Sequence, residues 1–189
     1  MSEQIEALIV EAERQTEEIL QLAASLEPDA FLWRPTPDKW SVGEHIEHIS
    51  LTNRPYLAAI DESVRAAREA GLTGAGPFRG GPIGRWFTRL LEPPPRRRMP
   101  TTSSLKPPPD LNRDQVLGEL QSVQEATVAS LRTADGVDLR RANIRSPFMK
   151  LLKLPVIQAF EVMFAHTRRH IWLMREVLES ADFGSEGQG

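Results

Sequence analysis

The spacing of apolar residues predicts four long helices, the first near the N-terminus. From Ile5 to Leu26, apolar positions recur at steps of three and four residues, with one polar gap at Gln15. Charged residues occupy the opposite face, as in an amphipathic helix that packs against a core. The prolines of the next stretch, "EPDAFLWRPTPDKW", predict that the helix ends there, because proline disrupts a helix interior.

The second and third helices are marked by residues that cap helix N-termini. Ser41 is followed three positions later by Glu44, which is the pattern of a capping box, and apolar spacing continues to Ala67. Asn112 and Gln115 stand in the same relation at the start of the third helix. Both starts are therefore predicted from local side-chain chemistry as well as from periodicity.

The last helix is predicted to begin near Pro155, whose missing N–H is harmless in a first turn, and to continue to about Val177. Residues 71–111, here called the insert, are rich in glycine and contain two triple-proline runs and one triple-arginine run. Within the insert, the apolar spacing from Ile83 to Leu91 predicts a short amphipathic helix with Arg85 and Arg89 on its outer side.

No strand pattern or internal repeat interrupts these helices. We therefore predict an all-α fold in which residues 1–180 form a single domain, a four-helix bundle. The insert would be a long crossover between the second and third helices, and residues 181–189 a flexible tail.

Composition excludes several classes of function. The 189-residue chain has a formal net charge of -3, whereas a dedicated nucleic-acid binder is usually basic. The absence of cysteine excludes disulfides, a cysteine nucleophile, thiolate-bound zinc and iron–sulfur clusters. The acidic, periodic N-terminus does not resemble a signal peptide, and no apolar stretch approaches the roughly 20 residues of a membrane span. We expect a cytoplasmic protein without nucleic-acid or membrane partners.

The candidate chemistry lies in four histidines confined to two short motifs. "WSVGEHIEHI" contains His45 and His48, and "FAHTRRHIWLM" contains His166 and His170. The latter pair is four residues apart, so both rings project from one helix face and can chelate one metal ion. An isolated histidine pair of this kind usually lies on the surface or in the core without binding a metal. Confinement of every histidine to two inward-facing helices favours a metal site with His48 as third ligand.

Two neighbouring residues have more than one interpretation. His45 is either a partner of a metal ligand or an exposed helix residue, and we favour the exposed position. Glu44 either orients the His48 ring or completes the capping box, and we favour the capping box. The motif "HTRRH" lacks the glutamate that zincin metalloproteases carry beside their first histidine, which excludes that mechanism.

The ordered set "WSVGEHIEHI", "RSPF" and "HTRRHIW" resembles the DinB-like/YfiT-like superfamily, from the first helix to about Val177. The resemblance implies an up-down-down-up four-helix bundle with a long crossover between its second and third helices. It also implies His48, His166 and His170 as metal ligands. The family includes metal-dependent hydrolase-like proteins, S-transferases that use low-molecular-weight thiols, and mycothiol-dependent isomerases. The long insert, and Trp172 and Leu173 where relatives often carry glutamine, depart from the pattern.

Three histidine ligands would leave a coordination position open for water or substrate, as in catalytic sites. The ion, most simply zinc or nickel, can activate a water for hydrolysis or deprotonate a small thiol that attacks an electrophile. Arg96, Arg97 and Arg98 either bind carboxylates of such a thiol or form a solvated basic loop, which we favour. Trp86 and Phe87 either cover the site or pack against the end of the bundle, which we also favour.

The expected function is therefore a metal-dependent enzyme acting on small molecules by thiol transfer or hydrolysis. The alternative is a non-enzymatic, stress-related binding or dimerisation bundle whose metal site is structural or vestigial. A homodimer is the expected assembly, because two-fold dimers are the commonest oligomers.

Overall fold

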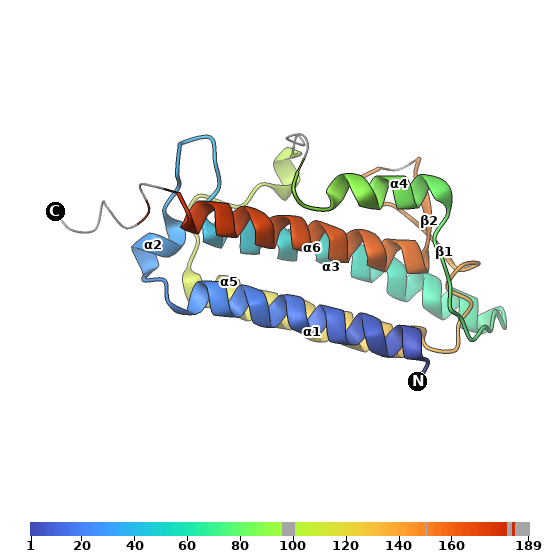
Figure 1. Ribbon diagram of the computed structural model, residues 1–189. Coiled ribbons are helices and arrows are strands. Elements are labelled where there is room, and N and C mark those ends of the chain that lie inside the picture. Colours follow the sequence, from blue (N-terminus) through green and yellow to red (C-terminus); the bar gives the residue numbers. More distant parts are fainter. Residues whose placement is uncertain (96–100, 150, 181–182, 184–189) are drawn as a thin grey trace.

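The computed structural model is mostly helical and describes residues 1–95, 101–149, 151–180 and 183. Four long helices lie alongside one another (Figure 1), and this mostly helical architecture confirms the coarse prediction of an all-α protein. They are α1 (Glu3–Ala24), α3 (Val42–Glu69), α5 (Arg113–Ala134) and α6 (Val156–Leu178). Helix α3 packs against both α5 and α6, and α1 packs against the same two helices.

The predicted helix starts are confirmed at the atomic level. The Ser41 hydroxyl accepts a hydrogen bond from the Glu44 backbone N–H at 3.2 Å, and the Glu44 carboxylate accepts one from the Ser41 N–H at 2.9 Å. The Asn112 side chain accepts from the Gln115 N–H at 3.1 Å. Glu44 also accepts from Arg34 Nε at 2.7 Å. These bonds satisfy backbone donors that a helix start otherwise leaves without a partner.

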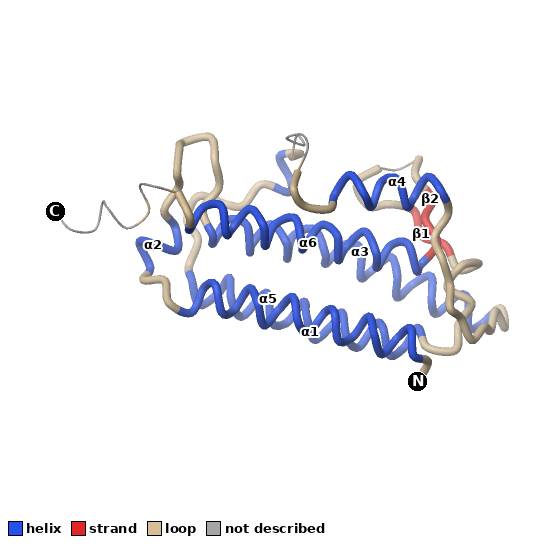
Figure 2. The backbone as a smooth tube through the Cα atoms, in the orientation of Figure 1, coloured by secondary structure: helices blue, strands red, loops and turns tan. Residues whose placement is uncertain are grey.

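Short elements connect the long helices (Figure 2). Helix α2 (Pro28–Leu32) follows α1, and the insert contains α4 (Pro82–Leu91) and a single turn of 3-10 helix, η1 (Ser103–Leu105). Two strands, β1 (Asn143–Arg145) and β2 (Lys153–Pro155), pair antiparallel just before α6. The sequence shows no strand pattern here, because three-residue strands carry too few positions to display an alternating one.

The short amphipathic helix of the insert is confirmed as α4, but its predicted packing was partly wrong. Ile83 and Trp86 are 73% and 61% exposed, respectively. The helix contacts α6 through a different side, where Gln158 Nε2 donates to Thr88 Oγ1 at 2.7 Å. Gly84 faces Gln158 so closely that a Cβ there would overlap the Gln158 side chain. The absence of a side chain at Gly84 therefore allows α4 to approach α6 by this side and leaves Ile83 and Trp86 exposed.

The core consists of two apolar clusters stacked along the helices. One includes Ile5, Ile60 and Phe160, and the other includes Ile46 and Met174. On α3 and α6 the break between them is filled by buried polar residues: Ser50, Thr52, Asn53, Thr167, Arg169 and His170. The α1 break is at Gln15, which donates to the Phe164 carbonyl at 3.2 Å. A polar layer thus crosses the middle of the molecule.

No helix in the described part of the chain has the length and apolar character needed to cross a lipid bilayer. Of the predicted tail, residues 181–182 and 184–189 lie outside the described residues. Phe183 is described, and its ring lies edge-on to Trp33 with centroids 5.5 Å apart.

Candidate metal centre

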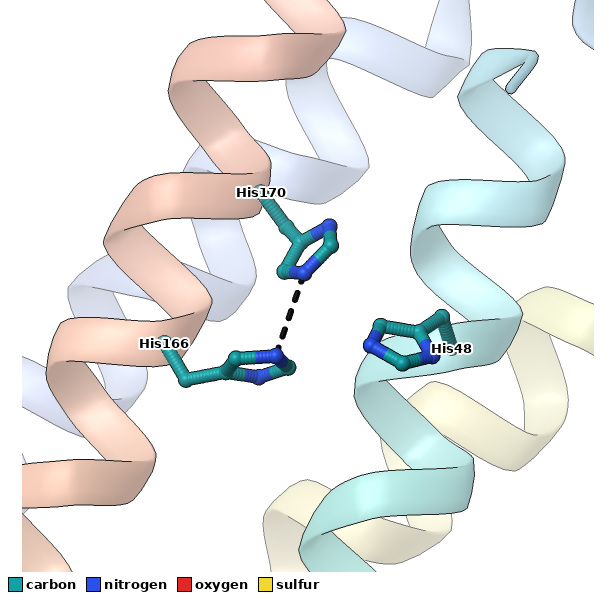
Figure 3. A group of neighbouring side chains, drawn as sticks. All are labelled: His48, His166 and His170. Carbon is teal, nitrogen blue, oxygen red and sulfur yellow. Dashed lines mark hydrogen bonds between the residues drawn. The ribbon is translucent and has the colours of Figure 1, made fainter. Parts of the chain in front are cut away.

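The histidines of the two sequence motifs meet in the seam between α3 and α6. His166 and His170 project from α6 toward His48 on α3 (Figure 3). One ring nitrogen from each of the three residues lies within 4.8 Å of the others. His48 and His170 are buried and His166 is half-buried. The structure therefore brings together the three residues that the sequence predicted as metal ligands.

The spacing of the nitrogens suits a single cation. The Nε2 atoms of His166 and His170 are 3.1 Å apart. Two imidazole nitrogens that both bind a tetrahedral ion at about 2.05 Å would be about 3.3 Å apart. The two α6 rings therefore need little adjustment to share one ion.

The opposite ring nitrogens of the three histidines have partners of their own. His48 Nδ1 donates to the Leu105 carbonyl of η1 at 2.7 Å, which places its proton on Nδ1 because a carbonyl only accepts. The single hydrogen of the Thr52 hydroxyl has the His48 and Ile49 carbonyls as acceptors, and when it is directed there the hydroxyl oxygen accepts from His166 Nδ1 at 3.4 Å. Such partners commonly fix the ring orientation of metal-binding histidines. Both contacts leave Nε2 directed to the site.

His45 belongs to the same cluster, so the exposed position that we favoured from the sequence was wrong. It is only 6% exposed, and its Nδ1 lies 2.9 Å from Nδ1 of His170. The spacing of His45 and His48, three residues apart on one helix, was the available signal. This spacing places the two rings on a partly shared side of α3, and the seam with α6 buries that side.

Trp40 covers the cluster, and its importance was not predicted beyond its place in the motif. Its ring centroid lies 4.7 Å from that of His48, and its ring stacks on His170 with an interplanar angle of 22°. Glu44 has the capping role that we favoured, since its carboxylate binds the Ser41 N–H and Arg34. The three arginines Arg96, Arg97 and Arg98 lie outside the described residues.

Burial lowers the pKa of all four histidines. Burial first, and the positive charge of protonated His48 second, lower the pKa of His45 to about 3. Burial and then neighbouring His48 and Arg169 lower the pKa of His166 to about 3. The pKa values of His48 and His170 are also lowered, in both cases chiefly by burial. The rings are therefore neutral at pH 7, as metal ligation requires.

A cavity of about 880 Å³ adjoins the cluster. Its walls include the four histidines, Trp40 and Arg169, and they continue to α4 through Phe87 and Leu91. The motif "RSPF" also reaches it, because Ser146 and Phe148 lie in the wall, with the Tyr56 hydroxyl 3.3 Å from Ser146 Oγ. The volume falls in the range of small-molecule sites, whose walls are mostly apolar with a few polar groups.

Comparison with known families matches residues 11–174 to the DinB superfamily. The chain belongs to the DinB superfamily. The match covers all three candidate ligands and most of the four long helices. Comparison with curated proteins and with solved structures returned no match. This DinB-superfamily chain thus contains a three-histidine group that is compatible with metal binding.

Proposed function

We propose that this DinB-superfamily protein is a divalent-metal-dependent enzyme that acts on small molecules, by thiol transfer or by hydrolysis. The observation that carries the proposal is the convergence of three neutral imidazoles beside a cavity of about 880 Å³. A purely structural ion would be better held by four protein ligands, whereas three leave a position for a reacting group.

His48, His166 and His170 would hold the ion through Nε2. A divalent cation at this position would supply Lewis acidity, which lowers the pKa of a water or a thiol that it binds. Zinc and nickel both accept imidazole ligands. Because the chain has no cysteine, a thiol nucleophile would come from a low-molecular-weight thiol in solution.

The protein's own residues shape what can react. Trp40 covers the rings and limits the access of bulk water, while Phe87 and Phe148 provide apolar cavity wall. The hydroxyls of Tyr56 and Ser146 offer hydrogen bonds to a substrate in the same cavity. These features favour a small substrate with an apolar or aromatic part and at least one polar group.

The proposed fold is an up-down-down-up four-helix bundle, with the insert as the crossover between α3 and α5 and residues 1–180 as one domain. The colour gradient of Figure 1 supports it, since α1 and α6 run in one direction and α3 and α5 in the other. In this arrangement the long insert returns over the α3–α6 seam. The Leu105 carbonyl and the α4 side chains in the cavity wall support that placement.

The first test is the metal content of the purified protein by plasma mass spectrometry, beside a His170→Ala variant. We expect about one equivalent of zinc or nickel in the wild type and its loss in the variant. Absence of metal from both, even after incubation with either ion, would contradict the proposal.

Two assays of the metal-loaded protein then separate the reactions. Thiol transfer predicts loss of free thiol when an electrophile and a small thiol are added together, and hydrolysis predicts turnover of activated esters without thiol. No turnover in either assay, with one tightly bound ion, would instead favour the non-enzymatic bundle. That alternative also predicts a large loss of thermal stability on chelation.

We further propose a homodimer as the assembly and neither nucleic acid nor membrane as partner. The exposed Ile83 and Trp86 of α4 are apolar surface that a second copy could cover. Sedimentation velocity would test the dimer, and a single species of 21.2 kDa at micromolar concentration would contradict it.

A further inference from the structure

His45 occupies a position that the ligand set alone does not explain. It lies one helical turn before His48 and is buried against His170, with the two Nδ1 atoms 2.9 Å apart. Two ring nitrogens at this distance form a hydrogen bond only if one carries a proton and the other does not. Each ring is neutral and has one proton, so the His45–His170 contact has two possible directions.

The direction of this bond determines whether His170 can bind a metal. If His45 Nδ1 donates, His170 must carry its proton on Nε2, which then points at His166 Nε2, 3.1 Å away. Nε2 of His170 then carries a hydrogen and has no lone pair for a cation. If His170 Nδ1 donates to His45, the proton of His45 is on Nε2 and the His170 Nε2 lone pair is available for a cation.

The partners of the other two candidate ligands are oxygen atoms. A carbonyl oxygen accepts from His48, and a hydroxyl whose hydrogen is directed to backbone carbonyls accepts from His166. The Leu105 oxygen has no hydrogen to donate, and the Thr52 hydroxyl cannot donate to His166 while its single hydrogen is directed to a backbone carbonyl. Among the three candidate ligands, His170 is the one whose Nδ1 faces a second imidazole, and that ring can donate or accept at this nitrogen.

We propose that His45 is a positioning residue whose tautomer opens or closes the metal centre. Without metal, His45 donates to His170, His170 donates to His166, and His166 donates to Thr52, which gives one continuous chain of hydrogen bonds. With metal, the proton of His170 is on Nδ1 and that of His45 is on Nε2.

The number of protons on the cluster is the same in both states. His45 loses the Nδ1 proton and gains one on Nε2, while His170 loses the Nε2 proton and gains one on Nδ1. Both residues line the cavity, so water can take up and return these protons. The inference rests on the proposed metal centre, and it assigns to His45 a role that the three ligands do not have.

The direct test uses the wild-type protein with ¹⁵N-labelled histidine and long-range ¹H–¹⁵N correlation spectra, before and after one equivalent of zinc. We expect His45 to be protonated on Nδ1 without zinc and on Nε2 with zinc, and His170 to change in the opposite sense. An unchanged His45 tautomer, or an Nδ1 proton on His45 in the zinc form, would overturn the inference.

Two variants test the same inference through affinity, measured by competition with a zinc chelator. His45→Leu removes the acceptor and should weaken zinc binding by roughly 10- to 100-fold, the usual effect of losing a partner of a metal-bound histidine. His45→Gln retains an acceptor oxygen and should recover most of that loss. Thr52→Val is the matched control at His166, and its longer 3.4 Å contact predicts a smaller loss.

The outcomes separate positioning from structural support and from failure of the metal centre. Equal losses in His45→Leu and His45→Gln, in step with equal losses of metal-free thermal stability, would leave only a packing role and overturn the inference. Wild-type affinity in His45→Leu would also overturn it while leaving the proposed function intact. A wild type that binds no zinc or other divalent ion would remove both. If His45→Leu does not fold, the wild-type spectra decide.

Discussion

The α1–α5 side of the molecule and the α3–α6 seam are built from the same kind of helix but filled differently. On α1 the buried positions are apolar except for Gln15, and on α5 the buried polar residues are Thr127 and Ser130. Helices α3 and α6 each bury four or more polar side chains, including His45, His48 and His170. Buried polar groups contribute little net stability even when hydrogen-bonded. One side is therefore mainly apolar core, and the other carries the candidate metal site.

The largest predicted effect on stability comes from truncating a core side chain on the α1–α5 side. Leu131→Ala on α5 removes a side chain that is 0% exposed, and the cavity left behind should cost about 2–5 kcal/mol of unfolding free energy. Urea denaturation would measure it, with half-buried Leu8→Ala as a milder control. Zinc affinity of the folded fraction should be unchanged. A large loss of affinity would show that the two sides are not separable.

The converse prediction concerns the seam. His48→Ala removes one of the three candidate ligands and should weaken zinc binding by more than about 100-fold, beyond the effect of losing a ligand's partner. The metal-free protein should lose less stability than in Leu131→Ala. Competition titration and urea denaturation together test this, with exposed Glu62→Ala on the same helix as control. An unchanged affinity would exclude His48 from the site.

The lowered pKa values of the seam predict how metal-free stability depends on pH. His45 and His166 have folded pKa values of about 3, against 6.5 for the ordinary side chain, so the unfolded chain binds more protons below pH 6.5. The unfolding free energy should therefore fall as the pH falls from 6.5 toward 3. Urea denaturation between pH 7.5 and 5 isolates the histidines from most carboxylates. His166→Gln should flatten the slope, whereas a slope independent of this residue would argue against its burial.

The smallest predicted effect compares two helix caps. Ser41→Ala and Asn112→Ala each remove an N-cap hydrogen bond and should each cost about 1 kcal/mol of stability. Only Ser41 begins the helix that carries His45 and His48, so only Ser41→Ala should also weaken zinc binding. Equal effects of the two variants on affinity would mean that the site does not depend on the local order of the α3 N-terminus.

Local signals in the sequence were sufficient for the helix starts and for the selection of the three candidate ligands that the structure brings together. The capping residues act on backbone groups two or three positions away, and His166 and His170 lie on one face through helix geometry alone. The approach of His48 could be predicted only on the assumption that its helix is a neighbour of α6, which the structure bears out.

Features that depend on distant contacts were missed. The burial of His45 depends on how α3 and α6 face each other, and the stacking of Trp40 on His170 depends on the path of the chain before α3. The exposure of Trp86 depends on Gly84, which allows α4 to approach α6 by a side other than its most apolar one. Contacts of this kind join segments that are far apart in the chain, so they leave no periodic pattern in the sequence.

The hydrogen bond from His48 to the Leu105 carbonyl constrains the length of the insert more than the identity of its residues. The acceptor is a main-chain oxygen, so almost any amino acid at position 105 would provide it equally well. The length of the insert, in contrast, determines which carbonyl arrives at the His48 ring. A deletion within residues 71–111 would therefore act on the candidate metal site without changing any candidate ligand, whereas substitution of the Leu105 side chain would leave this bond in place.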